Sequence, residues 1–478
     1  MTDLPEPDDG AALAKAIRSG RTTAVAAMEA ALVRAEEEAG LGAVSFLAAD
    51  LGRDQAAATD AGLARRPGYF RRRPFLGVPF LMKDLGAGAA GLPLRCGSAA
   101  LAPDPSRGDA ELARRFKAGG LVPFGLTTVP EFGLSLSSEP AIGPAARNPL
   151  DPALTAGGSS GGAASAVAAG IVALAHATDA GGSIRVPAAC CGLVGLKPTR
   201  GAMPGGPGFG NHLGGIAAEL VVSRSLRDTA LALDACSGHG EGFFPDPDLD
   251  LPSAGRLDET VAPLRIGSIL DVAKGRPIDP VRRDAVAHAA EVLRRAGHRL
   301  IAVDPAGLVP LLEASALVFD IVISTNLART MPDLARVERL TAAVARRGLA
   351  MTARDHQEAE MVAVRTAHEV WRLFDSVDIV LTPMLSGPPP SIGAFLFDHD
   401  DVDLHWRRMG DFAPYAMLAN IAGTPALTVP HGRDGDGLPL PVQLIGPMAS
   451  DGLLLRLGRL LQAAEPWTFR AAPAGLPT

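Results

Sequence analysis

The chain has 478 residues and a formal net charge of −7, with 45 Lys and Arg against 52 Asp and Glu and no long block of one sign. A mildly acidic, mixed surface of this kind argues against nucleic acid or an anionic membrane as the main partner. With 47% hydrophobic residues the chain can bury a large core, and an α/β enzyme of this length can form one continuous domain.

The cysteines and the N-terminal residues indicate the compartment. The four cysteines lack the spacing of a metal site, and small buried thiols in a reducing compartment account for them. The first ten residues have neither the basic start nor the apolar core of a signal peptide. No uninterrupted apolar stretch reaches the roughly 18 residues of a membrane span. We therefore expect a cytoplasmic protein that has neither a nucleic acid nor a membrane as partner.

In chain order, Ala-rich helices are predicted first, at 10–38 and 51–65. The apolar run 75–82 then predicts a buried strand that closes on Lys83 and Asp84. A lysine there either extends to the surface and pairs with Asp84, or stays buried. Burial disfavours the charged form, so a buried Lys83 would have a lowered pKa and act as a base.

A helix at 109–118, a strand at 121–126 and a Ser- and Pro-rich loop at 134–156 lead to the glycine-rich stretch 155–188. Ser159 and Ser183 each follow a Gly-Gly pair, and the apolar residues 163–177 between them predict a helix and a strand that bring the two serines together. Gly-Gly before a serine permits backbone conformations that a Cβ forbids and exposes N–H groups. Such N–H groups beside a hydroxyl make a nucleophile with an oxyanion hole. The stretch predicts a serine hydrolase.

The remaining chain predicts further α/β structure. Its expected elements are a strand and turn at 192–201, an irregular loop at 201–215, a helix at 223–238, a linker at 239–262, a β-α-β passage over 264–303, helices over 310–376, a loop at 386–411, strands at 377–383, 420–430 and 438–446, and a closing helix at 451–464. The segment 398–405 carries metal-binding side chains but no helical or strand phase, so we expect no metal. No glycine spacing matches a dinucleotide fingerprint, and we expect no cofactor.

At this point the sequence resembles the amidase signature hydrolases. The resemblance rests on Gly-Val-Pro-Phe-Leu-Met-Lys-Asp at 77–84, Gly-Gly-Ser-Ser-Gly-Gly at 157–162 and Asp-Ala-Gly-Gly-Ser-Ile-Arg-Val-Pro-Ala at 179–188, and it extends to about residue 465. It implies one α/β domain with a mixed, twisted central sheet flanked by helices on both faces. Within 1–478, we expect an N-terminal helical region (1–70), a catalytic core (71–238), a more variable part with a helical cap (239–376) and a C-terminal return to the sheet (377–470).

The resemblance also implies roles for residues that match its motifs. Ser183 would be the nucleophile, Ser159 a proton shuttle that follows a cis peptide bond, and Lys83 the neutral base. The N–H groups of the segment that ends in the nucleophile would form the oxyanion hole. Three further residues would contact the catalytic residues and hold their loop in place. The oxyanion set is Ala180, Gly181, Gly182 and Ser183, and the supporting set is Thr178, Asp179 and Arg185.

The implied reaction is hydrolysis of C–N bonds in non-peptide amides through an acyl-enzyme. The sequence around 179–201 and the loop around 138–149 are similar to nylon-oligomer hydrolases and to amidase-type urethanases, which act on carbamates. The residues do not separate these from general amidases or anilide hydrolases. The expected partner is a small-molecule amide or carbamate. Homodimers are common among such enzymes, but no residue here establishes one.

Three alternatives remain open. Gly-Gly-Ser-Ser-Gly at 157–161 fits the nucleophile elbow of α/β-hydrolases, which would make Ser159 the nucleophile and require a later Asp and His. A glutamine-dependent amidotransferase subunit of a tRNA-linked complex would require partner subunits. A pseudoenzyme or binding scaffold would need no intact Lys-Ser-Ser set, and all three residues are present.

Overall fold

The computed structural model describes residues 6–70, 72–205, 212–238, 244–272, 278–330 and 333–477. Within them, eleven strands form one mixed sheet in the order β1-β3-β2-β6-β8-β7-β12-β13-β11-β9-β10. The strands are β1 (Val44–Leu47), β2 (Val78–Lys83), β3 (Leu121–Thr127), β6 (Leu174–Asp179), β7 (Val194–Lys197), β8 (Ala218–Ser223), β9 (Arg265–Ser268), β10 (Arg299–Ala302), β11 (Ile379–Pro383), β12 (Ala426–Arg433) and β13 (Pro439–Ile445).

The sheet has a parallel group of strands toward each end and an antiparallel middle, and its edge strand β1 pairs antiparallel with β3. β3, β2 and β6 run parallel, as do β11, β9 and β10, whereas β6, β8, β7, β12, β13 and β11 alternate in direction. Every residue of β2, β3, β6 and β8 is buried. Burial on both faces explains why β2 and β3 are nearly continuous apolar runs rather than alternating ones.

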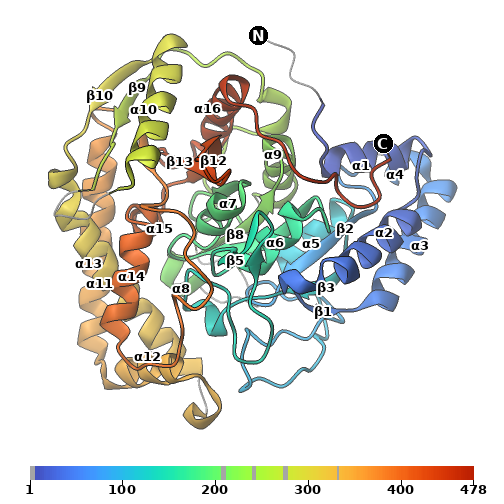
Figure 1. Ribbon diagram of the computed structural model, residues 1–478, viewed down its shortest axis with the longest axis horizontal. Coiled ribbons are helices and arrows are strands. Elements are labelled where there is room, and N and C mark those ends of the chain that lie inside the picture. The colour runs from blue at the N-terminus through green and yellow to red at the C-terminus, as the bar shows by residue number, and fades with distance from the viewer. Residues whose placement is uncertain are drawn as a thin grey trace.

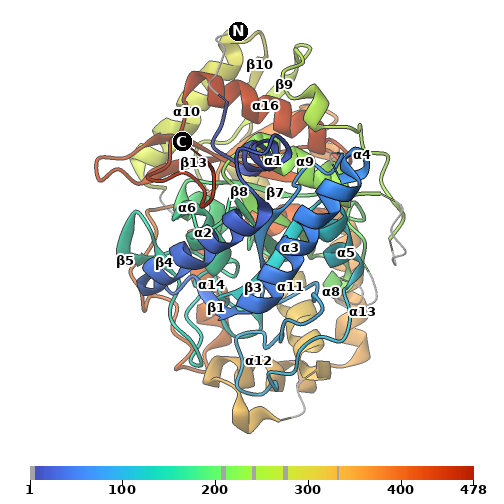
Figure 2. The ribbon, with the colours of Figure 1, turned by 90° about the vertical axis from the view of Figure 1, so that its right-hand side faces the viewer.

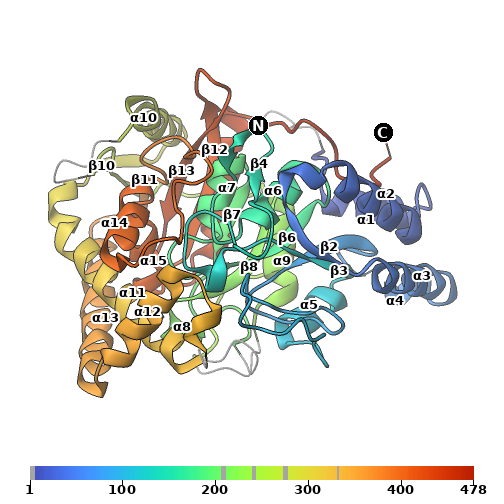
Figure 3. The same cartoon turned by 60° about the horizontal axis from the view of Figure 1, so that its bottom comes forward.

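Helices cover both faces of the sheet, which confirms the expected α/β class. Figure 3 shows α6 (Gly161–Ala168) and α7 (Arg185–Cys191) on one side of the central strands, with α5 (Glu111–Ala118) and α9 (Leu226–Cys236) on the other. Near the β1 edge, α2 (Ala24–Glu37) and α3 (Ala49–Arg65) lie side by side (Figure 2). The other covering helices are α1 (Gly10–Arg18), α4 (Pro67–Phe70), α10 (Pro280–Arg295) and α16 (Asp451–Ala464).

A group of helices lies at the opposite end from α1–α4 (Figure 1), and we refer to it as the cap; it draws on residues 402–422 as well as on the expected cap region 239–376. It comprises α11 (Val309–Thr330), α12 (Arg339–Ala350), α13 (Ala353–Leu373), α14 (Val402–Phe412) and α15 (Ala416–Ala422). The span Pro305–Thr330 is apolar and long enough to cross a membrane. It packs against α12, α13 and α15, as a core helix of a folded cap does.

The prediction of a loop over 386–411 is wrong for its second half, which is the helix α14. Asp401 caps this helix, since its side chain accepts a hydrogen bond from the N–H of Leu404. The buried side chains of α14 recur at helical spacing and include His405, whose Nε2 donates to Leu134 O at 3.0 Å. The acidic residues had obscured both the cap and this spacing.

Smaller departures concern the loops. The predicted loop 134–156 contains a separate two-stranded sheet, β4 (Arg147–Asn148) and β5 (Asp151–Thr155). The predicted irregular loop 201–215 ends in the helical turn α8 (His212–Gly215), and its residues 206–211 lie outside the described part of the chain. The short edge strand β1 was not predicted.

Candidate active site

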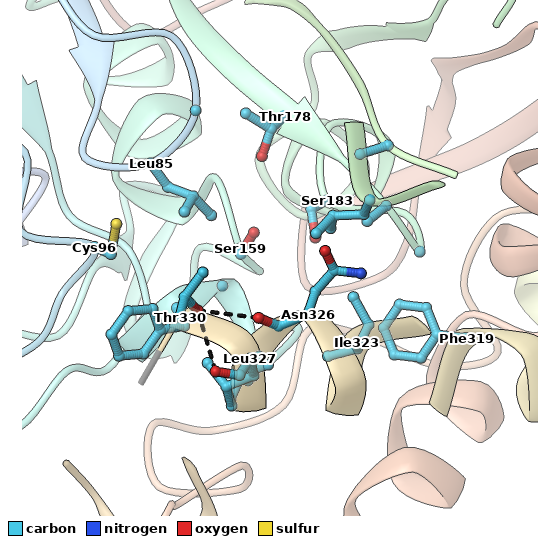
Figure 4. Close-up of a pocket in the computed structure, with 18 of the residues that line it drawn as sticks. Leu85, Cys96, Ser159, Thr178, Ser183, Phe319, Ile323, Asn326, Leu327 and Thr330 are labelled. Atoms are coloured by element: carbon cyan, nitrogen blue, oxygen red, sulfur yellow. Dashed lines mark hydrogen bonds between the residues drawn. The ribbon is translucent and has the colours of Figure 1, made fainter. Parts of the chain in front are cut away.

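Ser159 and Ser183, the two serines that follow Gly-Gly pairs, both line one pocket of about 560 Å³. The core side of this pocket is formed by the end of β2, the loop around Phe132, the Ser159 loop and the segment between β6 and α7. The cap side is formed mainly by α11. Figure 4 shows Ser159 and Ser183 on the core side, facing residues of α11. The apolar segment 163–177 forms α6 and β6, as expected, and it places the two serines at one site.

Lys83 is the last residue of β2 and is fully buried. Its Nζ lies 2.7 Å from Ser159 Oγ, 2.8 Å from Ser160 Oγ and 2.8 Å from Thr178 Oγ1. Asp84 does not pair with it, because the Asp84 carboxylate accepts from the N–H groups of Arg95 and Gly97. Lys83 therefore faces hydroxyl groups rather than a counter-ion.

This environment favours the neutral amine. Burial lowers the pKa of Lys83 to about 7, although the carboxylates of Asp179 and Glu219 act in the opposite direction. A neutral amine has two N–H donors and one lone pair. Ser160 Oγ donates its own hydrogen toward Thr178 O, at 3.3 Å, so it accepts from Nζ. If Thr178 Oγ1 takes the second N–H, the lone pair is left for the hydroxyl of Ser159.

Ser159 lies in the turn between β5 and α6, and the peptide bond that joins it to Gly158 is cis. Ser138 fixes this turn, since its Oγ donates to the carbonyl oxygens of Gly157 and Ser159 at 3.2 Å each. The same Oγ accepts from the N–H of Gly161 at 3.0 Å. The Ser159 side chain is thereby held between Lys83 and the open pocket.

Asp179 shapes the backbone around Ser183. Its carboxylate accepts from the N–H of Gly182 at 2.7 Å and of Ile184 at 3.1 Å, and from Arg185 Nε and Nη2 at 2.9 Å each. Burial alone would raise the pKa of Asp179, but the Arg185 guanidinium holds that pKa well below its usual range. Asp179 and Arg185 thus fix the turn that carries Ser183.

The C-terminal return of the chain completes this network. Asn420 Nδ2 donates to the backbone oxygen and to the carboxylate of Asp179 at 2.9 Å each, while its Oδ1 accepts from Arg185. Gln443 Oε1 accepts from Arg185 Nη1 at 2.7 Å. The sequence predictions missed all three of Asn420, Gln443 and Ser160, although Ser160 lies inside the motif at 157–162 and the other two lie in or beside the expected strands at 420–430 and 438–446.

The backbone donors of 180–183 differ from one another. The N–H of Gly182 is engaged by Asp179, whereas those of Ala180, Gly181 and Ser183 meet no acceptor among the described residues. Gly182 has φ +115°, and a Cβ there would lie 2.9 Å from the Cβ of Ala416. A Cβ at this position would therefore meet Ala416 in a backbone conformation that favours glycine. The N–H groups of Ala180, Gly181 and Ser183 are left without a protein acceptor among the described residues.

The sequence model of the family described as Amidase matches residues 26–455. This chain belongs to the amidase family. The amidase is 35% identical over 479 residues to AmiC of Mycobacterium tuberculosis, a protein named as an amidase, across 97% of this chain and 96% of that one. It superimposes on a solved 6-aminohexanoate cyclic dimer hydrolase with a TM-score of 0.88 and 29% identity, over 98% and 99% of the two chains. A bacterial aryl acylamidase gives a TM-score of 0.81 and 25% identity, over 96% of each chain.

These findings decide between the alternatives. The amidase is a hydrolase of amide C–N bonds, and its relatives give no support to a tRNA-linked amidotransferase. The nucleophile-elbow interpretation of Ser159 also fails structurally. The strand that precedes Ser159 belongs to the two-stranded sheet rather than the central one, and the partner of its hydroxyl is Lys83 rather than a histidine.

Proposed function

We propose that this amidase hydrolyses neutral amides and carbamates by acyl transfer to Ser183, with Ser159 and Lys83 as the proton relay. The observation that carries the proposal is the buried Lys83 Nζ at 2.7 Å from Ser159 Oγ, in the wall of the pocket that contains Ser183. An uncharged amine beside a hydroxyl chain supplies the base that a serine nucleophile needs.

The proposed steps balance as follows. Ser183 Oγ bonds to the substrate carbonyl carbon while its proton passes to Ser159 Oγ, and the proton of Ser159 passes to Lys83 Nζ. The N–H groups of Ala180, Gly181 and Ser183 bind the oxyanion that forms, and the engaged N–H of Gly182 is left out of this set. The C–N bond then breaks, and the leaving nitrogen takes a proton from Ser159, which takes one back from Lys83. Water releases the acyl group by the same relay.

The pocket lining supports neutral, largely apolar substrates. Its side chains are mostly aliphatic or aromatic, and Arg329 at the end of α11 is the one charged residue among the described lining. The solved neighbours named for a nylon cyclic dimer and for aryl acylamides fit this class. We propose anilides, nylon-type oligomers and carbamates as substrates. Where such a substrate carries a carboxylate, Arg329 is the lining residue whose charge would bind it.

Two measurements test the proposal. A panel of an anilide, a carbamate, a dipeptide amide, glutamine and malonamate should show turnover of the apolar members, and turnover of glutamine or malonamate alone would overturn the substrate class. A serine-reactive phosphonate should label the wild-type enzyme, should label Ser159→Ala more slowly, and should not label Ser183→Ala. Labelling of Ser183→Ala with none of Ser159→Ala would show that the roles are reversed.

We also propose a cytoplasmic location, with a small molecule rather than nucleic acid or a membrane as the partner. All four cysteines are free thiols, which suits a reducing compartment. A homodimer stays a proposal, and sedimentation equilibrium of the purified chain tests it.

A further inference from the structure

The cap wall of the pocket is one face of α11. Phe319, Ile323, Asn326, Leu327 and Thr330 all line the pocket, at the spacing that places residues on one side of a helix. Most of this face is apolar. Asn326 and Thr330 are its two uncharged polar residues, and they differ in what their polar atoms do.

The hydroxyl of Thr330 is committed to the helix itself. Its Oγ1 donates toward the backbone oxygens of Asn326 and Leu327, at 3.1 Å each, as the dashed lines of Figure 4 show. A single hydroxyl hydrogen shared between two carbonyls is not available to a ligand. Thr330 therefore has no hydrogen to donate to a ligand, although its oxygen keeps lone pairs that can accept one.

Asn326 presents an acceptor to the pocket. Its Nδ2 donates to Val322 O at 2.8 Å, and this bond fixes the orientation of the carboxamide because only the NH₂ end can donate to a carbonyl. Its Oδ1 accepts no hydrogen bond from the residues that the structure describes. In Figure 4 the side chain extends from α11 toward Ser183. Asn326 Oδ1 is thus an acceptor on α11 that faces Ser183 from a mostly apolar wall.

We infer that Asn326 is a specificity-determining residue whose Oδ1 accepts the N–H of the scissile amide or carbamate. The inference rests on the proposed function, because the serine roles fix where the leaving nitrogen lies. That nitrogen must direct its lone pair at Ser159 to receive a proton, so its own hydrogen points elsewhere, and α11 forms the wall opposite the serines. An ester has an oxygen in place of the N–H and offers Oδ1 no donor. Asn326 therefore favours secondary amides and N–H carbamates over esters of the same acid.

The test compares a matched pair of substrates, the p-nitroanilide and the p-nitrophenyl ester of hexanoic acid. kcat/KM reports acylation for both, whichever step limits kcat. Asn326→Leu removes the acceptor at similar volume, and Asn326→Ala removes it with a smaller side chain. Both should lower kcat/KM for the anilide by about 5- to 10-fold, the worth of one hydrogen bond, and leave the ester within about 2-fold of wild type. Phosphonate labelling of each variant shows that the nucleophile is intact.

Leu327→Ala is the matched control, because Leu327 lines the same wall without a polar group. It should change both substrates by the same factor, leaving the anilide-to-ester ratio at the wild-type value. An equal loss on both substrates in Asn326→Leu, or no loss on the anilide, would overturn the inference while the proposed function stands. A wild-type enzyme inactive on both substrates would overturn the proposed function and this inference with it.

Discussion

The lowered pKa of Lys83 makes the pH dependence of acylation a quantitative test. Burial lowers the pKa of Lys83 to about 7, and only the unprotonated amine can take the proton from Ser159. With that pKa, about 1% of the enzyme has a neutral Lys83 at pH 5 and about 90% at pH 8. kcat/KM for a neutral substrate should therefore rise about 90-fold between pH 5 and pH 8 and then level off.

The assay is the initial rate of hexanoyl p-nitroanilide hydrolysis from pH 5 to pH 10 at constant ionic strength, with circular dichroism recorded at each pH. Two other groups titrate in the same range and need controls. Burial raises the pKa of Glu338 to about 7, and burial together with Arg185 lowers that of Lys197 to about 7. Neither residue lines the pocket, so Glu338→Gln and Lys197→Met should keep the midpoint near 7.

Two results would refute the reasoning about Lys83. A profile that still climbs tenfold per pH unit between pH 8 and pH 10 would indicate an ordinary exposed lysine, for which only about 0.3% is neutral at pH 8. A profile flat from pH 5 to pH 8 would indicate that no group with the pKa of Lys83 acts as the base.

Three further predictions concern the support of the site and its mouth. Arg185→Met leaves the buried Asp179 carboxylate without its main partner and should lower the free energy of unfolding in urea by about 3 kcal/mol or more. An unchanged urea midpoint would show that the Asp179–Arg185 pair does not stabilise the fold. Gly182→Ala should lower kcat/KM by about 100-fold, because a Cβ would meet Ala416 in a turn at φ +115°. Circular dichroism should show that the fold is retained, and a near-normal rate would show that the turn tolerates a side chain. Arg329→Gln should raise KM for the p-nitroanilide of adipic half-acid, and this factor should be about 3 times the factor by which it changes KM for the hexanoyl anilide. Equal factors for the two substrates would show that Arg329 takes no part in substrate recognition.

The chemistry-bearing segments could be found from the sequence because each breaks a local rule. Lys83 ends a buried apolar run where a charge is costly, and the structure buries it completely, with the lowered pKa that burial predicts. Ser159 and Ser183 each follow a Gly-Gly pair, and the structure brings both to one pocket. These features depend on residues that are neighbours along the chain. The cis Gly158–Ser159 bond was implied by the resemblance to amidase signature hydrolases rather than by these residues.

Features that depend on distant contacts could not be found in this way. The N–H of Gly182 belongs to a segment of four expected oxyanion donors, and only the folded position of Asp179 shows that it is already engaged. Asn420 and Gln443 lie more than 230 residues from their partners and meet them through the order of the sheet strands. The helix α14 was missed because Asp401 resembles its acidic loop neighbours until its hydrogen bond to Leu404 is seen.

The carboxylates nearest the base explain why one group should control the acid side of the pH profile. Burial raises the pKa of any isolated carboxyl, and a site in which Asp179 or Glu219 titrated near 7 would change the charge around Lys83 as the rate was measured. Arg185 and Asn420 hold the pKa of Asp179 well below its usual range, and the hydrogen bond from His176, with His212 nearby, does the same for Glu219. Both carboxylates therefore stay ionised from pH 5 to pH 8. Their constant negative charge raises the pKa of Lys83, whereas burial lowers it. The expected midpoint of the pH profile near 7 is the balance between these two effects.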